Sequence, residues 1–383
     1  MQLTLAGQSA LAFWIWAAQP DNCLLDLSPN VRRQKPSSHF EIAQGAPLKV
    51  IRKRERKCLP KSFKISVKRA ETDNLLRELN QTGPLHVLVQ DASMKRNREG
   101  IQTQCMLEAT RVRAFYEIFE GFYVSAPELT FVHLCSQLPR TYLTMLGYEL
   151  CGEYAIDDNA LGGFIARPSL MTKDDVKNLF AVWRAPNQKK MAMRAIGDVL
   201  EKTASPAESQ LAALLTLPTR AGGFGFPAPQ ANAAVLQDAC SQKISGKQWR
   251  ACDLFWEREL VDVEYDSEAH HSTREQRFRD SVRRNALTSA GIKVISVTPN
   301  QLQSVHEMRT VAQALARALG KRIRVRINDY ELRQCKLHKT VMQSYPKWRR
   351  DLLSKHCDKN DVSSNDTEAA LDDIEIESFY ELP

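Results

Sequence analysis

The sequence has no closely spaced pair of cysteines. It contains nine cysteines, an odd number, and none stands in a C-x-x-C motif; they lie at positions 23, 58, 105, 135, 151, 240, 252, 335 and 357. Zinc ribbons and thioredoxin-like sites need the close pair, and disulfide frameworks usually show an even number at regular spacing. The pattern argues against both kinds of site and indicates reduced thiols in a cytoplasmic protein.

The sequence also lacks an apolar run long enough to cross a bilayer. Its most apolar stretch reaches only from Leu3 to Ala18, whereas a membrane helix needs about 20 residues. The first basic residue is Arg32, so the stretch has no charged start of the kind that signal peptides have. We expect no membrane association, and we interpret this stretch as a helix that is buried or contacts a partner.

Basic residues are absent from positions 361–383, which hold eight acidic residues. The chain has 53 basic and 45 acidic residues in total, so positions 1–360 hold 53 against 37 and carry a net charge of +16. A body this basic attracts polyanions, of which nucleic acid is the commonest, although any single basic cluster is also typical of a solvated surface. We expect DNA as a partner and a disordered acidic tail.

Length and local composition predict more than one domain. A chain of 383 residues exceeds the typical domain of about 100–200 residues. We expect a loop-rich N-terminal segment over 1–60, an α+β domain over 61–203, an α/β domain over 204–330, a basic extension over 331–360 and the acidic tail over 361–383.

Apolar runs, caps and prolines predict the elements. Strands are expected at 86–90, 101–107, 115–124, 251–256, 260–266 and 293–298. Helices are expected at 140–149, at 173–203 with a break near Pro186, and at 206–217, 273–289 and 304–319. Thr172 and Asp175 have the spacing of a capping box, and Ser125 followed by Pro127 predicts another helix start. A hairpin followed by strand–helix–strand connections predicts an α/β sandwich around a mixed sheet in the second half.

The second half also concentrates acidic residues. Asp262, Glu264 and Asp266 alternate with apolar residues, which puts three carboxylates on one face of a predicted strand. Asp253 lies on the preceding strand, and two histidines follow at 270–271. Like charges on one face repel, and such a face is tolerated where solvent, a cation or a basic partner neutralises it. A divalent cation bound through oxygens is one such solution.

Phosphodiester hydrolysis is a reaction that these groups can support. A divalent ion can stabilise charge on a phosphoryl oxygen and activate water near neutral pH. Mg²⁺ takes only one or two carboxylates and keeps several waters, so Asp253 and Glu264 suffice as its ligands. Asp266 or His271 can act as general base, or His271 can protonate the leaving oxygen. The predicted helix from Thr273 carries arginines that can hold phosphates, namely Arg274, Arg277, Arg279, Arg283 and Arg284.

Several separated segments recur in one order that is typical of a known family. They are Cys252–Trp256, Val263–Ser267, His270–His271, Asp280–Leu287, Gly291–Thr298 and Gln301–Leu302. Together they resemble the DUF559 domain, which is related to very-short-patch-repair endonucleases and belongs to the PD-(D/E)XK nuclease superfamily. The resemblance covers about 205–320. It implies a restriction-endonuclease-like α/β sandwich and DNA cleavage with Mg²⁺ or Mn²⁺.

The resemblance implies a role for five residues. Asp253 and Glu264 match the metal-binding acids of the two core strands, and Glu208 matches the acid of the preceding helix. Asp266 stands where many members have lysine and the repair endonucleases have histidine, and His271 matches a second histidine of the latter. Because the lysine is absent, the resemblance is also compatible with a non-catalytic DNA-binding or antitoxin-like regulator.

Each candidate also has a purely structural interpretation. Glu208 follows Ser205 at capping-box spacing, which explains its identity without catalysis. Glu264 and Asp266 can be outward residues of a half-exposed strand, the histidines can end that strand, and the arginines can cover a solvated helix.

A second resemblance concerns the first half. Pro84–Val89, the basic segment Lys95–Arg98 and Gly121–Glu128 are similar to the C-terminal region of AbiEi-type antitoxins. The resemblance implies a toxin–antitoxin or defence setting, with a toxin protein as a further partner. The hypothesis for the whole chain is a cytoplasmic DNA-associated protein with a metal-dependent endonuclease-like domain.

Overall fold

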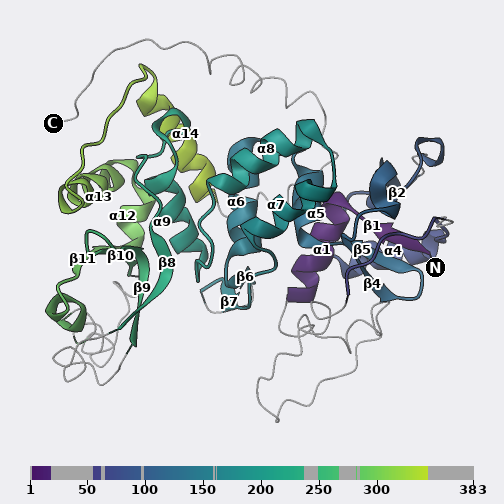
Figure 1. Ribbon diagram of the computed structural model, residues 1–383, viewed down its shortest axis with the longest axis horizontal. Coiled ribbons are helices and arrows are strands. Elements are labelled where there is room, and N and C mark those ends of the chain that lie inside the picture. Colours follow the sequence, from purple (N-terminus) through teal and green to yellow (C-terminus); the bar gives the residue numbers. More distant parts are fainter. Residues whose placement is uncertain are drawn as a thin grey trace. The chain divides into compact units, whose positions relative to one another are not determined.

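The protein is a mixed α/β chain that divides into two compact units. The structure, a computed structural model, describes residues 2–18, 55–61, 65–95, 99–157, 160, 162–236, 249–266, 282 and 285–343. Unit 1 takes its described residues from Met1–Leu150 and Ala155–Gly197, and unit 2 from Cys151–Tyr154 and Asp198–Tyr345. Each unit has its own mixed sheet with helices packed on it (Figure 1).

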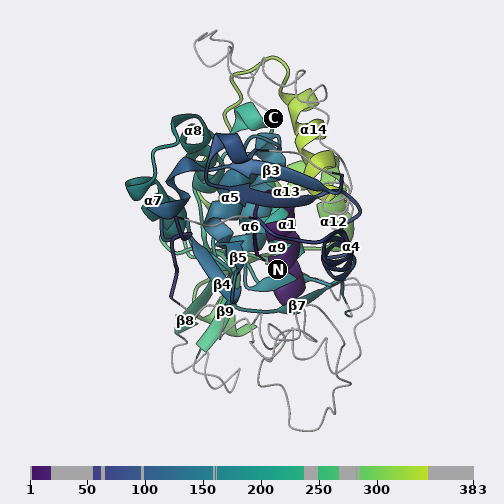
Figure 2. The ribbon, with the colours of Figure 1, turned by 90° about the vertical axis from the view of Figure 1, so that its right-hand side faces the viewer.

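Unit 1 is built on a five-stranded sheet of order β3-β2-β1-β5-β4. Strand β1 is antiparallel to β2 and parallel to β5, β3 is parallel to β2, and β4 is antiparallel to β5. The sheet is therefore mixed; Figure 2 labels its strands β3, β4 and β5, and Figure 1 labels β1 and β2. The strands are β1 (Leu3–Leu5), β2 (Leu85–Val89), β3 (Ile101–Cys105), β4 (Phe115–Phe119) and β5 (Phe122–Ser125).

The N-terminal apolar stretch forms the centre of this unit. Leu3–Leu5 is the middle strand, and Gly7–Ala18 forms helix α1, which is buried as expected. Trp14 of α1 is 1% exposed and donates a hydrogen bond to the Ser125 carbonyl at 2.8 Å. Gly7, at φ +49°, makes the turn from strand to helix, a backbone conformation that glycine adopts easily. Part of the expected loop-rich segment 1–60 is thus core.

The remaining helices of unit 1 test the predicted caps. The capping box of Thr172 and Asp175 is confirmed at the start of α7, and the break near Pro186 separates α7 from α8. The prediction that Ser125 caps a helix is wrong: Ala126 is the N-cap, and the Ser125 hydroxyl donates to the Leu5 carbonyl at 3.0 Å. The helices are α4 (Arg69–Glu78), α5 (Pro127–Leu134), α6 (Arg140–Cys151), α7 (Lys173–Val182) and α8 (Pro186–Gly197).

Two predictions for strands needed correction. The apolar run at 115–124 forms two strands, β4 and β5, because Gly121, at φ +78°, turns the chain between them. A short two-stranded sheet, β6 (Tyr154–Ile156) with β7 (Phe164–Ala166), was not predicted.

Unit 2 contains a four-stranded sheet of order β11-β10-β9-β8. Strands β10 and β11 are parallel, whereas β9 is antiparallel to both β8 and β10. The predicted mixed sheet is confirmed, and the predicted strands appear as β9 (Trp249–Trp256), β10 (Val261–Tyr265) and β11 (Lys293–Val297). The fourth strand, β8 (Gln230–Leu236), was not predicted.

Helices cover this sheet at two places. Helix α9 (Pro206–Thr216) packs against β9 and β10, and α13 (Val305–Ala318) packs against β11. The expected helix at 304–319 is preceded by a separate short helix, α12 (Pro299–Gln303), and Ser304 caps α13. Residues 285–289 are helical, within the helix expected at 273–289. Helix α14 (Tyr330–Met342) packs on α9 and completes the described part of the unit.

The glycines at 222 and 223 serve packing. A Cβ on Gly222 would lie 2.4 Å from the Arg333 carbonyl oxygen, and one on Gly223 would lie 2.1 Å from that of Leu217. The Tyr330 hydroxyl donates to the Gly223 carbonyl at 3.1 Å. These close approaches join α14 to the loop after α9 and account for both glycines.

Helix length and hydropathy bear on the membrane prediction. Within the described ranges, no helix is both long and apolar enough to span a bilayer.

Candidate metal centre

Strands β9 and β10 bring two of the predicted ligands together. Val263 of β10 pairs with Leu254 of β9, so the next residues along, Glu264 and Asp253, are neighbours across the two strands. The backbone N–H of Tyr265 donates to Asp253 Oδ2 at 2.9 Å. This bond fixes the Asp253 carboxylate next to the backbone of the residue that follows Glu264.

Asp262 lies deeper than the alternating pattern indicates. The pattern puts it on a face with Glu264 that solvent or a partner would neutralise, but its exposed fraction is 0%. It pairs in register with Phe255 of β9, whose side chain is also buried. Among the described residues, neither carboxylate oxygen of Asp262 has a partner in hydrogen-bond geometry. A buried carboxylate without such partners is costly to ionise.

The electrostatics of Asp262 report on the whole cluster. Its pKa is raised to about 8, first by burial and then by the negative charges of Glu264 and Asp253, while the Cys252 thiol acts in the opposite direction. The three carboxyl groups therefore lie close enough to repel one another. Asp262 belongs to this cluster but was not among the predicted site residues. Its position two residues before Glu264 places both side chains on the same face of the strand, and this spacing could have identified it.

Asp266 follows the end of β10. Its backbone N–H donates to the Val297 carbonyl at 2.9 Å, which extends the pairing with β11, and its side chain is half-buried. The pKa of Tyr265 is raised by burial and then by the charge of Asp266. Asp266 thus lies at the strand end beyond the other acids.

Glu208 makes the contacts of a helix cap. Its Oε1 accepts from the Ser205 hydroxyl at 2.9 Å, its Oε2 accepts from the Ala204 N–H at 2.7 Å, and its own N–H donates to Ser205 Oγ at 3.1 Å. Both carboxylate oxygens therefore hold the start of α9. The structural interpretation of Glu208 is the one that these contacts support.

The other predicted site residues lie outside the described ranges. These are the histidine His271 and the arginines Arg274, Arg277, Arg283 and Arg284. Among the residues that are described, no three or more His, Cys, Asp or Glu side chains are arranged as a metal-binding group. The candidate centre is thus a pair of ligands, Asp253 and Glu264, with Asp262 beside them.

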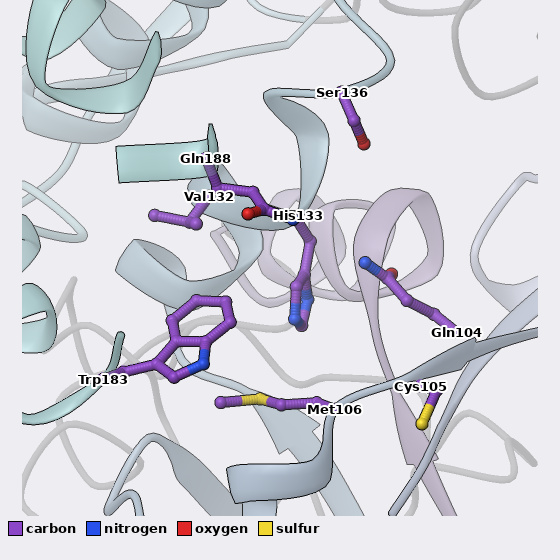
Figure 3. A pocket seen from close by; sticks show the side chains of 8 residues that line it. All are labelled: Gln104, Cys105, Met106, Val132, His133, Ser136, Trp183 and Gln188. Atoms are coloured by element: carbon purple, nitrogen blue, oxygen red, sulfur yellow. The ribbon is translucent and has the colours of Figure 1, made fainter. Parts of the chain in front are cut away.

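Unit 1 contains a small pocket around a buried histidine (Figure 3). His133 of α5 points into it. Its ring packs edge to face against the Trp183 ring, with the two ring centroids 6.4 Å apart. Burial lowers the pKa of His133 to about 3, so the ring is neutral. The cavity volume is about 40 Å³, which is room for about three waters. The lining residues are Gln104, Cys105, Met106, Val132, His133, Ser136, Trp183 and Gln188. This volume is well below the roughly 300–1,000 Å³ of a typical ligand pocket.

Comparison with known proteins gives no family for the chain. Searches against protein-family models, curated proteins and solved structures found no match.

Proposed function

We propose that unit 2 is a metal-dependent DNA endonuclease related to the DUF559 domain, with a restriction-endonuclease-like α/β sandwich. The observation that carries the proposal is the register of β9 and β10, which brings Asp253 beside Glu264 and Asp262, together with the Tyr265 N–H that holds the Asp253 carboxylate there. The expected partner is DNA, because positions 1–360 carry a net charge of +16. The AbiEi-like segments of unit 1 favour a cytoplasmic defence or toxin–antitoxin setting with a toxin partner.

The residues present fit a hard divalent cation. Carboxylate oxygens are the ligands that Mg²⁺ and Mn²⁺ prefer, and Mg²⁺ needs only one or two of them. A cation held by Asp253 and Glu264 would also offset the negative charges that raise the pKa of the buried Asp262. When bound, such an ion stabilises charge on a phosphoryl oxygen and lowers the pKa of water.

The chain's own groups supply the remaining chemistry. Asp253 is held by the Tyr265 N–H, so it keeps its orientation without reorganisation when a phosphate arrives. Asp266 lies two residues after Glu264, at the end of β10. As the predicted general base, it would accept a proton from the attacking water.

Cleavage with matched variants tests this proposal. The wild-type protein is expected to nick or cut DNA in Mg²⁺ or Mn²⁺ and to be inactive in EDTA. Asp253→Asn and Glu264→Gln are expected to lower the cleavage rate by about a hundredfold or more, because the ion's charge stabilisation contributes several kcal/mol. The control is Glu257→Gln, an exposed acid after β9, which should cleave like wild type. Equal cleavage by all four proteins would reject the assignment.

A non-catalytic DNA-binding or antitoxin-like regulator is the second candidate. It is favoured by Asp266, which stands where the superfamily commonly has lysine. Wild-type protein that binds DNA but leaves it intact in both metals would select the regulator.

A further inference from the structure

A buried histidine of unit 1 has no hydrogen-bond partner among the described residues. His133 of α5 is 4% exposed, and neither its Nδ1 nor its Nε2 lies in hydrogen-bond geometry with another described residue. Nearly all buried polar side chains in folded proteins are hydrogen-bonded, because an unpaired one loses its hydration without compensation. The ring points into the pocket of Figure 3, which we call the His133 pocket. A ligand in this pocket can supply the partner that the ring lacks.

Neutral side chains line the His133 pocket. None of the lining residues is Asp, Glu, Lys or Arg. The imidazole is neutral because burial lowers its pKa to about 3, and the pKa of the Cys105 thiol is raised, first by burial. An ion would lose its hydration here without gaining a counter-charge, so the ligand that suits the pocket is neutral. Since a neutral imidazole has one N–H donor and one nitrogen acceptor, that ligand should both donate and accept hydrogen bonds.

Packing fixes the walls of the His133 pocket. Trp183 is 7% exposed, and its ring stacks on that of Phe180, with the ring centroids 6.2 Å apart and the planes at 9°. Met106 is 3% exposed. Figure 3 draws Trp183 and Gln104 on opposite sides of the His133 ring. Walls that are already held by their neighbours lose little conformational freedom when a ligand enters, which favours binding.

We propose that the His133 pocket binds a primary carboxamide group. A carboxamide is neutral and has both a carbonyl acceptor and an NH₂ donor, so it complements the imidazole and the side-chain amides of Gln104 and Gln188. Its three non-hydrogen atoms match a cavity volume of about 40 Å³, which is room for about three waters. Ser136 is exposed and lines the same cavity, so the pocket reaches the surface. The group can therefore belong to a free small amide or to the glutamine or asparagine side chain of a larger ligand.

Histidine ring signals in the NMR spectrum of the full chain, labelled with ¹⁵N-histidine, test this proposal. Formamide is titrated at constant pH and compared with formate, which has the same size but a negative charge. The signals of the His133 ring nitrogens are expected to shift with formamide and to saturate, with half-saturation at about 1 mM or above, because so few atoms supply limited binding energy. Formate is expected to leave these signals unchanged. The signal that is absent from His133→Phe identifies the residue.

His338 is the internal control for His133. It is also buried, but its Nε2 lies 2.9 Å from the Leu302 carbonyl oxygen, so its ring already has a partner and its signals should not move. An equal shift of both histidines, an equal response to formate, or no saturable shift with formamide would overturn the proposal. The last result would mean that water alone fills the His133 pocket.

The size of the probe distinguishes the two sources of the amide. The methylamides of N-acetylglutamine and N-acetylglutamate differ only in the side-chain amide. A shift of the His133 signals with the glutamine derivative, and none with the glutamate derivative, would assign the pocket to the side chain of a larger ligand. A response to formamide without a response to the glutamine derivative would assign it to a free small amide. Neither metal nor DNA is present, so the outcome is independent of the proposed nuclease.

Discussion

Replacement of Asp262 by asparagine is expected to raise the free energy of unfolding of the metal-free protein by on the order of 4 kcal/mol at pH 7. The wild-type side chain is fully buried and has a pKa of about 8. The folded state must therefore take up a proton at pH 7 that the unfolded chain, with an ordinary aspartate, does not hold. Asparagine removes this cost because it never ionises.

The pH dependence of this effect has a defined sign. The native state keeps the Asp262 proton up to about pH 8, whereas the unfolded chain loses it near pH 4. Between these values the unfolded state binds fewer protons, so the stability of the wild type falls as the pH rises, and this contribution levels off above pH 8. Urea unfolding in EDTA at pH 5, 7 and 9 measures it.

Asp174→Asn is the control for Asp262. Asp174 is exposed, and its pKa is lowered by Lys177, so its replacement should not alter the pH profile between 5 and 9. If Asp262→Asn and wild type show parallel profiles over that range, the carboxyl group is not buried among like charges as described.

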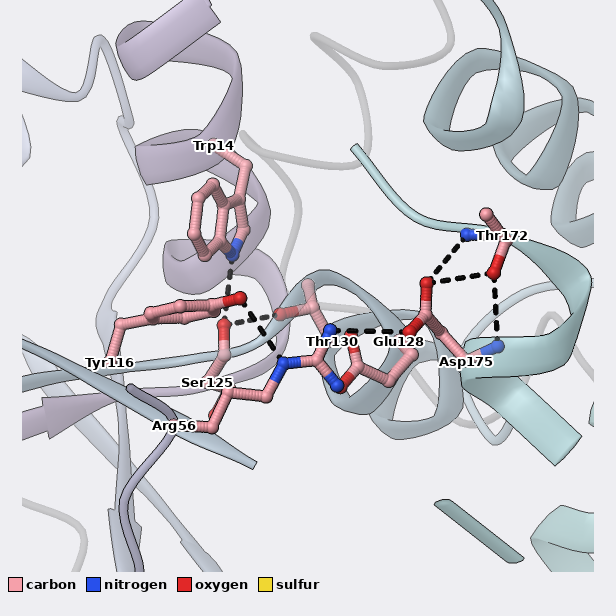
Figure 4. A network of polar contacts seen from close by, with 8 residues as sticks. All are labelled: Trp14, Arg56, Tyr116, Ser125, Glu128, Thr130, Thr172 and Asp175. Atoms are coloured by element: carbon pink, nitrogen blue, oxygen red, sulfur yellow. Dashed lines mark hydrogen bonds and ion pairs between the residues drawn. The ribbon is translucent and has the colours of Figure 1, made fainter. Parts of the chain in front are cut away.

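Removal of Arg56 is expected to destabilise the protein by about 3 kcal/mol at pH 8. The Arg56 guanidinium contacts Glu128 at 2.7 Å and Asp175 at 3.3 Å, and its Nε donates to the Tyr116 hydroxyl at 3.1 Å (Figure 4). Glu128 is 1% exposed, and burial raises its pKa to about 7 against the opposing effect of Arg56. Arg56→Ala leaves this carboxylate buried without its cation.

The loss on removing Arg56 should depend on pH. Without the cation, the pKa of Glu128 rises further, so the folded variant keeps a proton that the unfolded chain loses near pH 4. The destabilisation is therefore expected to be smaller at pH 5 and to grow by up to about 1.4 kcal/mol between pH 5 and pH 8, as measured by urea unfolding. Arg113→Ala breaks a pair with Glu55 whose side chains are more than 70% exposed, and it should cost less than about 1 kcal/mol. Equal losses for the two variants would contradict the role of Arg56.

Local signals in the sequence predicted the elements better than they predicted the site. The cap at Thr172, the break at Pro186 and the strand at 293–298 depend on nearby residues, and the structure contains all three. Strand β8 was missed because Gln230–Leu236 is rich in alanine and has little strand propensity; its pairing with β9 decides its conformation.

The candidate site shows the same limit. Alternation placed Asp262 and Glu264 on one face, and the register of β9 and β10 brings Asp253 beside them. The pattern cannot tell how deeply a face is buried, because burial depends on cross-strand neighbours such as Phe255 and on the helices packed over the sheet. Asp262 was therefore expected to be accessible, although it is inside.

Divalent cation binding tests the central claim most directly. Thermal unfolding is followed while Mg²⁺ or Mn²⁺ is added to wild type, Asp253→Ala and Glu264→Ala, without DNA. An ion that binds only the folded state raises the midpoint as its concentration passes the dissociation constant. We predict a rise for the wild type at millimolar metal and none for either variant; an unchanged wild-type midpoint, or the same rise in all three proteins, would contradict a cation site at these carboxylates.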